Sequence, residues 1–307
     1  MRDPSGRYFD IAVIGFALTA MFAWPAAGTE AAPDFSGMWG RNAFNFEALS
    51  SGPHPVSNLR RVGKDASTPI VVGDPIPLVG DYTNPILRPE AAAVVKQRGE
   101  ISASGRDFPD PSNGCAPHSP PFILQMQLGV QVLQTKDRVT FVYPQDHQVR
   151  HVFLNVSHAA HVKPSWYGES VGHYEGDTLV VDTVGIKVGP ASMVDRFGTP
   201  QSAAMHVVER YRLIGAKEAR EAQERHEKTA GRVGDTPEGV PFDPAYGKGL
   251  QVTVTVDDPN VFTAPWSSNI TYGRSMRGWA EVVCAENNTD VLHQGFERVP
   301  QADKPDF

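Results

Sequence analysis

The stretch His173-Tyr-Glu-Gly-Asp-Thr-Leu-Val-Val-Asp-Thr183 decides the fold of this chain. Polar and apolar residues alternate on both sides of Glu175-Gly176-Asp177, and a short turn between two alternating runs is typical of an antiparallel hairpin. Similar segments recur from about residue 122 to residue 284 with few helical segments between them. The sequence therefore predicts a protein whose core is a meandering β-sheet.

The other expected strands follow the same alternation. They are Leu128–Thr135, Val139–Tyr143, Gln148–Leu154, Glu169–Tyr174, Thr178–Thr183, Met205–Ile214, Leu250–Asp257 and Trp279–Cys284. A sheet with this many antiparallel strands and few covering helices must close into a barrel or double into a sandwich, because open edges promote aggregation. We predict an all-β fold, a closed or nearly closed antiparallel β-barrel of the lipocalin (calycin) kind, with short helices and one helical insertion.

Two segments outside the sheet are expected to be helical. Arg88–Arg98 has a proline near its first turn and an Ala/Val run behind it. Ala216–Thr229 is charged and Ala-rich, and it belongs to an insertion, residues 216–248, between two strands. The insertion is either a tolerated surface excursion or a lid over the mouth of a cavity.

The composition limits the function classes. Of 307 residues, 40% are hydrophobic and 21% are charged, and the net charge is −7. Because nucleic-acid binding needs a basic stripe, and the sequence has none, we expect no nucleic-acid partner. The sequence also contains no nucleophile elbow, P-loop, dinucleotide fingerprint or zincin motif. The expected partner is a small-molecule substrate or ligand, without a nucleotide cofactor.

The N-terminus is typical of a secretory signal peptide. Arg2 and Arg7 precede the apolar run Ile11–Ala23, and Ala26-Ala27-Gly28 offers small residues for cleavage. We therefore expect residues 1–28 to be removed and the protein to be periplasmic or secreted, with no stable membrane insertion after cleavage. The alternative is an uncleaved membrane anchor.

The remaining chain divides into three expected parts. They are a loop-rich segment with the first strand and a short helix (29–121), a barrel domain (122–299) and a C-terminal tail (300–307). Export gives the two cysteines, Cys115 and Cys284, an oxidising compartment. We expect them to form a disulfide, which would contribute about 4 to 5 kcal/mol in the chain-entropy model. Two separate thiols are the alternative.

Motifs along the mature chain form a recognisable set. They are Pro33–Trp39, Asp146–Arg150, Pro164–Gly168, Gly172–Thr183, His206–Arg210, Val254–Pro259 and Val283–Asn287. Together they resemble a large group of mostly uncharacterised secreted bacterial proteins, and the resemblance implies a shared fold and export rather than a known reaction. The chain departs from the group at Glu169 and at Gly198–Ser202, where the group has histidines. These departures imply a specialised substrate.

Histidines supply most of the candidate catalytic groups, because imidazole exchanges protons near neutral pH. On a strand, His147 and His151 share one face and Arg150 points to the other. His158 and His161 lie in the following loop, and His206 starts a later strand. The predicted catalytic residues are His147, Arg150, His158, His161, Asp195 and His206.

Two of these residues have a structural alternative. Arg150 would steady developing negative charge on the substrate, and its alternative is a salt bridge to Glu169 or Asp182. Asp195 would act as a base, and its alternative is to cap a turn.

The predicted substrate-binding residues are Trp166, Tyr167, Glu169, His173, Trp266 and Glu281. The aromatic ones would stack on a partly apolar ligand, although such residues more often fill a core. The histidine spacings are compatible with a metal ion but are not diagnostic, because alternate strand residues lie roughly 7 Å apart. We therefore expect no cofactor, and a bound metal ion is the alternative.

These residues predict an exported small-molecule enzyme that uses general acid–base chemistry in a barrel cavity. The expected reaction is that of a lyase, isomerase or cyclase, or of a hydrolase, on a partly apolar substrate. The main alternative is a non-catalytic, lipocalin-like carrier of a hydrophobic ligand. A third reading is a structural or envelope-interaction protein with a filled barrel. An enzyme needs at least two titratable groups that converge at an accessible site.

Overall fold

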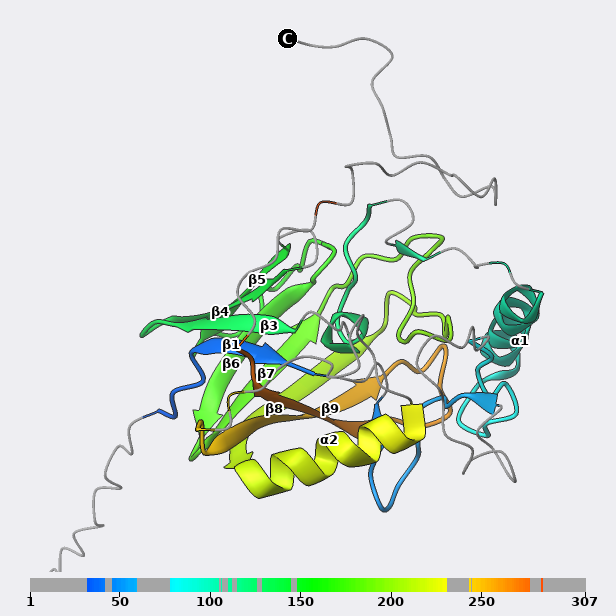
Figure 1. Ribbon diagram of the computed structural model, residues 1–307. Coiled ribbons are helices and arrows are strands. Elements are labelled where there is room, and N and C mark those ends of the chain that lie inside the picture. Colours follow the sequence, from blue (N-terminus) through cyan, green and yellow to red (C-terminus); the bar gives the residue numbers. More distant parts are fainter. Residues whose placement is uncertain are drawn as a thin grey trace, which may run out of the picture. The chain divides into compact units, whose positions relative to one another are not determined.

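Strands close into a barrel in the computed structural model of this protein (Figure 1). The structure describes residues 32–41, 46–59, 78–104, 106, 110–111, 115–125, 129–144, 148–230, 243, 245–276 and 283. All of them belong to one compact unit that begins at Ala32.

In the described part of the chain, ten strands form the sheet. They are β1 (Gly37–Gly40), β2 (Glu47–Ala48), β3 (Val130–Gln134), β4 (Arg138–Tyr143), β5 (Gln148–Leu154), β6 (Glu169–Glu175), β7 (Thr178–Val184), β8 (His206–Gly215), β9 (Lys248–Asp257) and β10 (Trp266–Arg274). Their order is β1-β3-β4-β5-β6-β7-β8-β9-β10-β2, and β1 also pairs with β10. This last pairing closes a ring of nine strands and leaves β2 beside it. The predicted all-β barrel is confirmed.

One pairing in the ring is parallel. Val152 on β5 lies opposite Ser170 on β6, and the loop 155–168 carries the chain back to the end where β5 began. A closed ring with an odd number of strands cannot alternate in direction all the way round, so at least one neighbouring pair must be parallel. The expectation of a purely antiparallel barrel is therefore wrong at this one pairing.

The alternation of side chains determines which residues fill the barrel. On β7, Leu179, Val181 and Thr183 are buried, while Asp182 and Val184 on the opposite face are partly exposed. On β9, the residues from Leu250 to Val256 follow the same period of two. Each strand thus presents one face to the core and one to the outer wall.

Most strand predictions agree with the structure to within two residues, but the two-residue strand β2 and the strand β10 were not predicted. Residues Trp266–Gly273 of β10 pair with β9, and β10 also pairs with β1. The predicted final strand, Trp279–Cys284, lies almost wholly outside the described residues.

Both predicted helices are present. They are α1 (Pro89–Ala103) and α2 (Ala216–Ala230). In the sequence, helix α2 lies between β8 and β9, two strands that pair with each other. The helix contacts both of them as well as β10 (Figure 1). A Cβ atom added to Gly249 would lie only 2.3 Å from Cβ of the buried Ala219, so the helix packs directly on β9. The described part of the insertion therefore packs on the barrel wall. The choice between a surface excursion and a lid stays open, because residues 231–242 and 244 lie outside the described residues. Neither α1 nor α2, in the part of the chain that is described, is long and apolar enough to cross a membrane.

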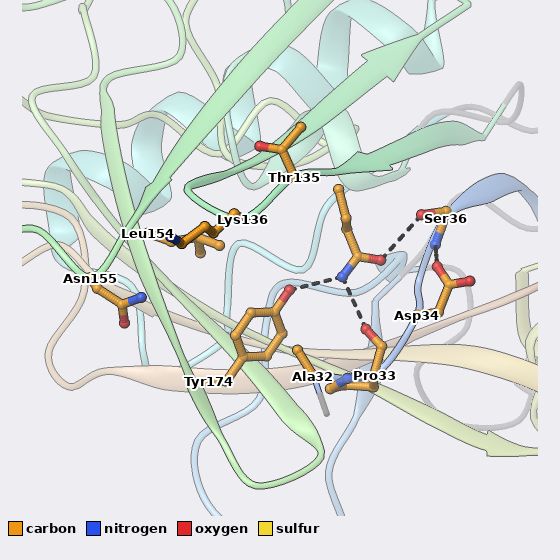
Figure 2. A pocket seen from close by; sticks show the side chains of 10 residues that line it. Ala32, Pro33, Asp34, Ser36, Thr135, Lys136, Leu154, Asn155 and Tyr174 are labelled. Atoms are coloured by element: carbon orange, nitrogen blue, oxygen red, sulfur yellow. Dashed lines mark hydrogen bonds between the residues drawn. The ribbon is translucent and has the colours of Figure 1, made fainter. Parts of the chain in front are cut away.

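The segment before β1 is fastened to one end of the barrel (Figure 2). The amide of Gln134, the last residue of β3, donates to the carbonyl of Pro33 (3.0 Å) and to the hydroxyl of Tyr174 (2.8 Å). Its carbonyl oxygen accepts the backbone N–H of Phe35. One side chain thus joins the N-terminal segment, β3 and β6.

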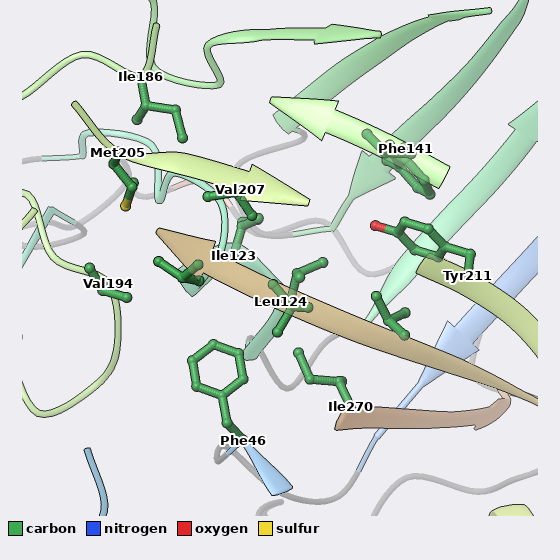
Figure 3. Packing of buried hydrophobic residues seen from close by; sticks show 14 of the residues in the cluster. Phe46, Ile123, Leu124, Phe141, Ile186, Val194, Met205, Val207, Tyr211 and Ile270 are labelled. Atoms are coloured by element: carbon green, nitrogen blue, oxygen red, sulfur yellow. The ribbon is translucent and has the colours of Figure 1, made fainter. Parts of the chain in front are cut away.

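The inside of the barrel is a packed core (Figure 3). Inward side chains such as Phe141, Val207 and Ile270 form one cluster with Ile123 and Leu124. The last two belong to a short 3₁₀ helix, η4 (Phe122–Gln125), and are at most 2% exposed. The described inward residues therefore form a largely apolar core, and the expected site inside a barrel cavity stays a prediction.

Candidate functional site

Arg150 is buried inside the barrel in an ion pair with Glu209. Nη1 of Arg150 lies 3.0 Å from Oε1 of Glu209, and Nη2 contacts Oε2. The remaining donors reach Thr183 (2.7 Å) and Ser170 (3.1 Å), and the hydroxyl of Tyr211 donates to Glu209. The guanidinium is thus committed to protein partners. Arg150 is therefore not free to contact a substrate, as its predicted catalytic role requires. The salt bridge that was its structural alternative is present, but its partner is Glu209 rather than Glu169 or Asp182.

A second polar cluster lies on the outer wall, and we call His158, Glu169, Asp182 and His206 the outer-wall cluster. Oδ1 of Asp182 lies 2.8 Å from Nε2 of His206 and 3.0 Å from Nε2 of His158. Nδ1 of His158 lies 2.9 Å from Oε1 of Glu169. Asp182 and His206 are each 40% exposed, so a molecule from solvent can reach them.

Three strands and one loop build this cluster. Glu169, Asp182 and His206 stand on the outward faces of β6, β7 and β8, at one end of each strand. Asp182 lies directly opposite Val208 in the β7–β8 ladder, so His206 is its diagonal neighbour, within reach for side chains on one sheet face. The sheet register therefore brings the carboxylates and the imidazole together.

The loop 155–168 brings His158 to the strands. The backbone N–H of Ala159 donates to Oε1 of Glu169 (2.8 Å), and Ser165 donates to the carbonyl of Gly185 (3.1 Å). Gly185 has a φ of +68°, and a methyl group there would lie 2.3 Å from a methyl of Val162. This close approach holds the loop flat against the end of β7.

The two partners of His158 favour its protonated form. Both of its ring nitrogens lie within hydrogen-bond distance of carboxylate oxygens. A neutral imidazole has only one N–H, so both contacts are hydrogen bonds only when the ring is doubly protonated. Burial lowers the pKa of His158, but the hydrogen bonds from its ring to Asp182 and Glu169 outweigh that effect and raise the pKa above its usual value.

His206 differs from His158 in its contacts. Its Nε2 faces Asp182, whereas its Nδ1 has no hydrogen-bond partner in the described residues. A carboxylate that accepts the Nε2 proton fixes the ring tautomer and leaves the lone pair of Nδ1 directed outward. Nδ1 of His206 is therefore the atom in the cluster that is best placed to exchange a proton with a bound molecule.

The other predicted binding residues lie elsewhere. Trp266 is 1% exposed and packs against Phe46 and Phe262, so its expected role in stacking on a ligand is wrong. His173 points outward and its Nε2 lies 3.1 Å from Glu175. Neither residue joins the outer-wall cluster.

Three predicted residues lie in or beside the loop 155–168. His161 is exposed in it. The ammonium group of Lys187 lies over the ring of Trp166, 4.8 Å from the ring centre. The hydroxyl of Tyr167 donates a hydrogen bond to the side-chain carbonyl of Gln148. The predicted stacking of Trp166 and Tyr167 on a ligand stays a prediction.

Asp195 is 1% exposed and caps a turn. Its Oδ1 accepts the backbone N–H groups of Phe197 (2.9 Å) and Thr199 (3.3 Å). Burial raises its pKa to about 6. The turn-capping alternative therefore describes its geometry, and the expected role as an accessible base is wrong.

Several predictions fall outside the described residues. His147, Glu281 and Cys284 belong to this set, so the Cys115–Cys284 disulfide stays a prediction. Within the described ranges, no group of three or more His, Cys, Asp or Glu side chains is arranged to hold a metal ion.

Sequence reasoning did not place Asp182 in the site, although it joins both histidines. The available signal is the outward position of Asp182 in the strand Thr178–Val184, whose opposite face is apolar. The step from that position to His206 needs the β7–β8 register.

Comparisons of the chain with protein-family models, with curated proteins and with solved structures found no match.

Proposed function

We propose that this protein is an exported enzyme that acts on a small, partly apolar molecule by general acid–base chemistry at the outer-wall cluster. One observation carries the proposal. Oδ1 of Asp182 accepts hydrogen bonds from His158 and His206, and the His206 side chain is 40% exposed to solvent. A histidine oriented by a carboxylate is the common arrangement for proton transfer at neutral pH.

The expected step is a proton transfer within one substrate. Nδ1 of His206 takes a proton from a carbon or hydroxyl group, and Asp182 stabilises the imidazolium that forms. The proton then returns to another atom of the same molecule in an isomerisation, or to the leaving group in an elimination. A positive charge on His158 offsets the negative charges of Asp182 and Glu169. It therefore reduces the repulsion between these carboxylates and the negative charge that develops on the substrate.

The rival function is that of a carrier, which binds a ligand and does not convert it. A carrier would use the apolar interior of the barrel, whereas the proposed enzyme uses the polar groups on the outer wall. The two functions differ in whether a compound that binds is also consumed.

The test follows both binding and conversion for a panel of aromatic and terpenoid compounds. Purified protein is incubated with each compound, and substrate loss and product formation are measured by mass spectrometry. Replacing His206 by Gln keeps a group that can contact Asp182 but removes the base, and we expect turnover to fall by about 10²- to 10⁴-fold.

His151→Gln is the matched control. His151 is also an exposed, outward-facing histidine on the barrel wall, and it contacts Thr140 (3.1 Å) rather than the cluster. Binding without conversion would support the carrier. Conversion that survives His206→Gln at the wild-type rate would overturn the proposed mechanism.

Export is part of the proposal. The arginine-flanked apolar run at the N-terminus and the paired number of cysteines support it. Cell fractionation should place the processed chain outside the cytoplasm, and a mass measurement of that chain before and after reduction should show a gain of two hydrogens. A full-length chain in the cytoplasmic fraction would contradict export.

A further inference from the structure

A pocket of about 400 Å³ opens at the end of the barrel where the β3–β4 turn and the ends of β5 and β6 meet the segment before β1 (Figure 2). It is separate from the outer-wall cluster. Tyr174 lines the pocket from the inward face of β6, whereas Glu169 stands on the outward face of the same strand. Five residues of strand separate them, roughly 17 Å.

One wall of the pocket is apolar and held in place. The ring of Tyr174 is fixed because its hydroxyl accepts a hydrogen bond from Gln134 (2.8 Å), which is itself tied to Pro33 (3.0 Å). Leu154, which is 6% exposed, also lines the pocket. A fixed aromatic ring and a buried aliphatic side chain form a surface on which an apolar ligand group packs at little entropic cost.

Two opposite charges flank this wall. Figure 2 shows Lys136 on one side of the pocket and Asp34 on the other. Oδ1 of Asp34 accepts the backbone N–H of Ser36 (2.9 Å), a hydrogen bond that lowers the pKa of Asp34 and keeps it ionised. A cation and an anion on facing sides match a ligand that itself carries both charges.

Asn155 adds a polar group to the lining of the pocket. It has a φ of 58°, and its backbone N–H donates to the carbonyl of Gly172 (2.7 Å), which fixes the turn after β5. The amide side chain lines the pocket (Figure 2). An amide can donate to and accept from a peptide group of the ligand.

We propose that this pocket binds a short peptide-like zwitterion, two or three residues long, with an aromatic or branched side chain. Its carboxylate pairs with Lys136, its ammonium pairs with Asp34, and its apolar side chain packs on Tyr174 and Leu154. The volume lies at the lower end of the range for drug-sized ligands, about 300 to 1,000 Å³.

The probe is the dipeptide Phe-Leu, and its binding to the purified protein is measured by calorimetry. Lys136→Met and Asp34→Asn should each weaken binding about three- to fivefold, because these charges are exposed to solvent. Tyr174→Ala should weaken it about tenfold or more. Lys163→Met and Asp177→Asn, exposed charges outside the pocket, should leave binding unchanged.

Chemical variants of the ligand test each charge separately. N-acetyl-Phe-Leu lacks the ammonium, so it should bind wild type more weakly than Phe-Leu does. It should show no such deficit against Asp34→Asn, because that variant has already lost the pairing. The amide Phe-Leu-NH₂ should behave likewise with Lys136→Met.

Three results would overturn the assignment. They are no heat of binding up to the solubility limit of Phe-Leu, equal affinity for the capped and free peptides, and equal losses in the pocket variants and the surface controls. Thermal melting of every variant confirms that the compared proteins are folded. The assignment does not depend on the proposed proton transfer at His206, since the two sites share no residue.

Discussion

Arg150 on β5 and Glu209 on β8 form a two-point ion pair inside the barrel, and two strands, β6 and β7, separate them along the sheet. The two side chains are 1% and 0% exposed. Ser170 on β6 and Thr183 on β7 satisfy the other guanidinium donors that face them. The pair therefore links four consecutive strands from within.

Removal of one member of this pair should destabilise the protein strongly. Glu209→Leu leaves a buried guanidinium without a counter-charge, and we expect the free energy of unfolding to fall by about 3 to 5 kcal/mol. The double variant Arg150→Met/Glu209→Leu removes both charges and should recover most of that loss. Urea unfolding curves followed by tryptophan fluorescence measure both effects.

A surface pair provides the control. Nη1 of Arg210 lies 2.7 Å from Glu175, and these side chains are 46% and 48% exposed. Arg210→Met should change the free energy of unfolding by about 1 kcal/mol or less, since exposed ion pairs contribute little. If Glu209→Leu costs no more than Arg210→Met, the barrel interior is wetter than its burial indicates.

The sequence carried a signal for each member of the buried pair but not for the pair itself. Glu209 interrupts the apolar face that Val207 and Tyr211 form on β8, and Arg150 interrupts the apolar face of β5. A charge on an apolar face predicts a buried partner. The strand that supplies this partner is determined by how the sheet closes into a barrel. The alternation of side chains along one strand does not tell which strands face each other across the barrel.

Strand existence was predictable where polar and apolar residues contrast sharply, as in Leu250–Asp257, and not where the contrast is weak. In β10 the inward face contains Ser268, and the outward face contains Thr271, which is 1% exposed. Hydroxyl residues on both faces blur the alternation. The outer-wall cluster was predicted only in part. His158 comes from a loop, and its path depends on contacts with Gly185 that strand alternation does not predict.

Gly185 should control the position of His158. Gly185→Ala places a methyl group 2.3 Å from Val162, so the loop must move away from β7. We expect the pKa of His158 to move back toward its usual value of about 6.5, because the bonds to Asp182 and Glu169 lengthen. NMR titration of the histidine C–H signals measures this shift.

Gly176→Ala is the control for Gly185→Ala, because it introduces the same backbone strain without a steric clash. Gly176 has a φ of +60°, and a methyl group there has no atom within 4 Å. It should cost about 1 to 2 kcal/mol from strain alone and leave the His158 titration unchanged. An equal effect of both variants on His158 would show that Val162 does not hold the loop.

The His158 interaction should weaken as pH rises. The pKa of His158 is higher in the folded protein than in the unfolded chain. The stabilisation is therefore complete below the unfolded pKa, about 6.5, and is lost as pH rises through the folded value. Because the cluster is partly exposed, the loss should be about 1 kcal/mol or less.

The measurement compares wild type with His158→Gln. The difference in free energy of unfolding between them should be larger at pH 5.5 than at pH 8.5. A difference that stays constant, or that grows toward high pH, would mean that His158 is not held as a cation.

Asp195 should give a second pH dependence with a different midpoint. Burial raises its pKa from 3.8 to about 6, so the folded protein favours the protonated form. Stability from this group is complete below pH 3.8 and falls as pH rises through 6. A shift from 3.8 to about 6 corresponds to roughly 3 kcal/mol at neutral pH.

Asp195→Asn should remove this loss. The amide oxygen can still accept the backbone N–H groups of Phe197 and Thr199, and it carries no charge. Between pH 4 and pH 7.5 we therefore expect wild type to lose more stability than the variant, by an amount that approaches the full penalty of ionising a buried carboxyl. Urea unfolding at four pH values over this range provides the comparison. Parallel stability curves would show that the hydrogen bonds to Asp195 offset its burial, and the carboxylate would then be a stable cap at neutral pH.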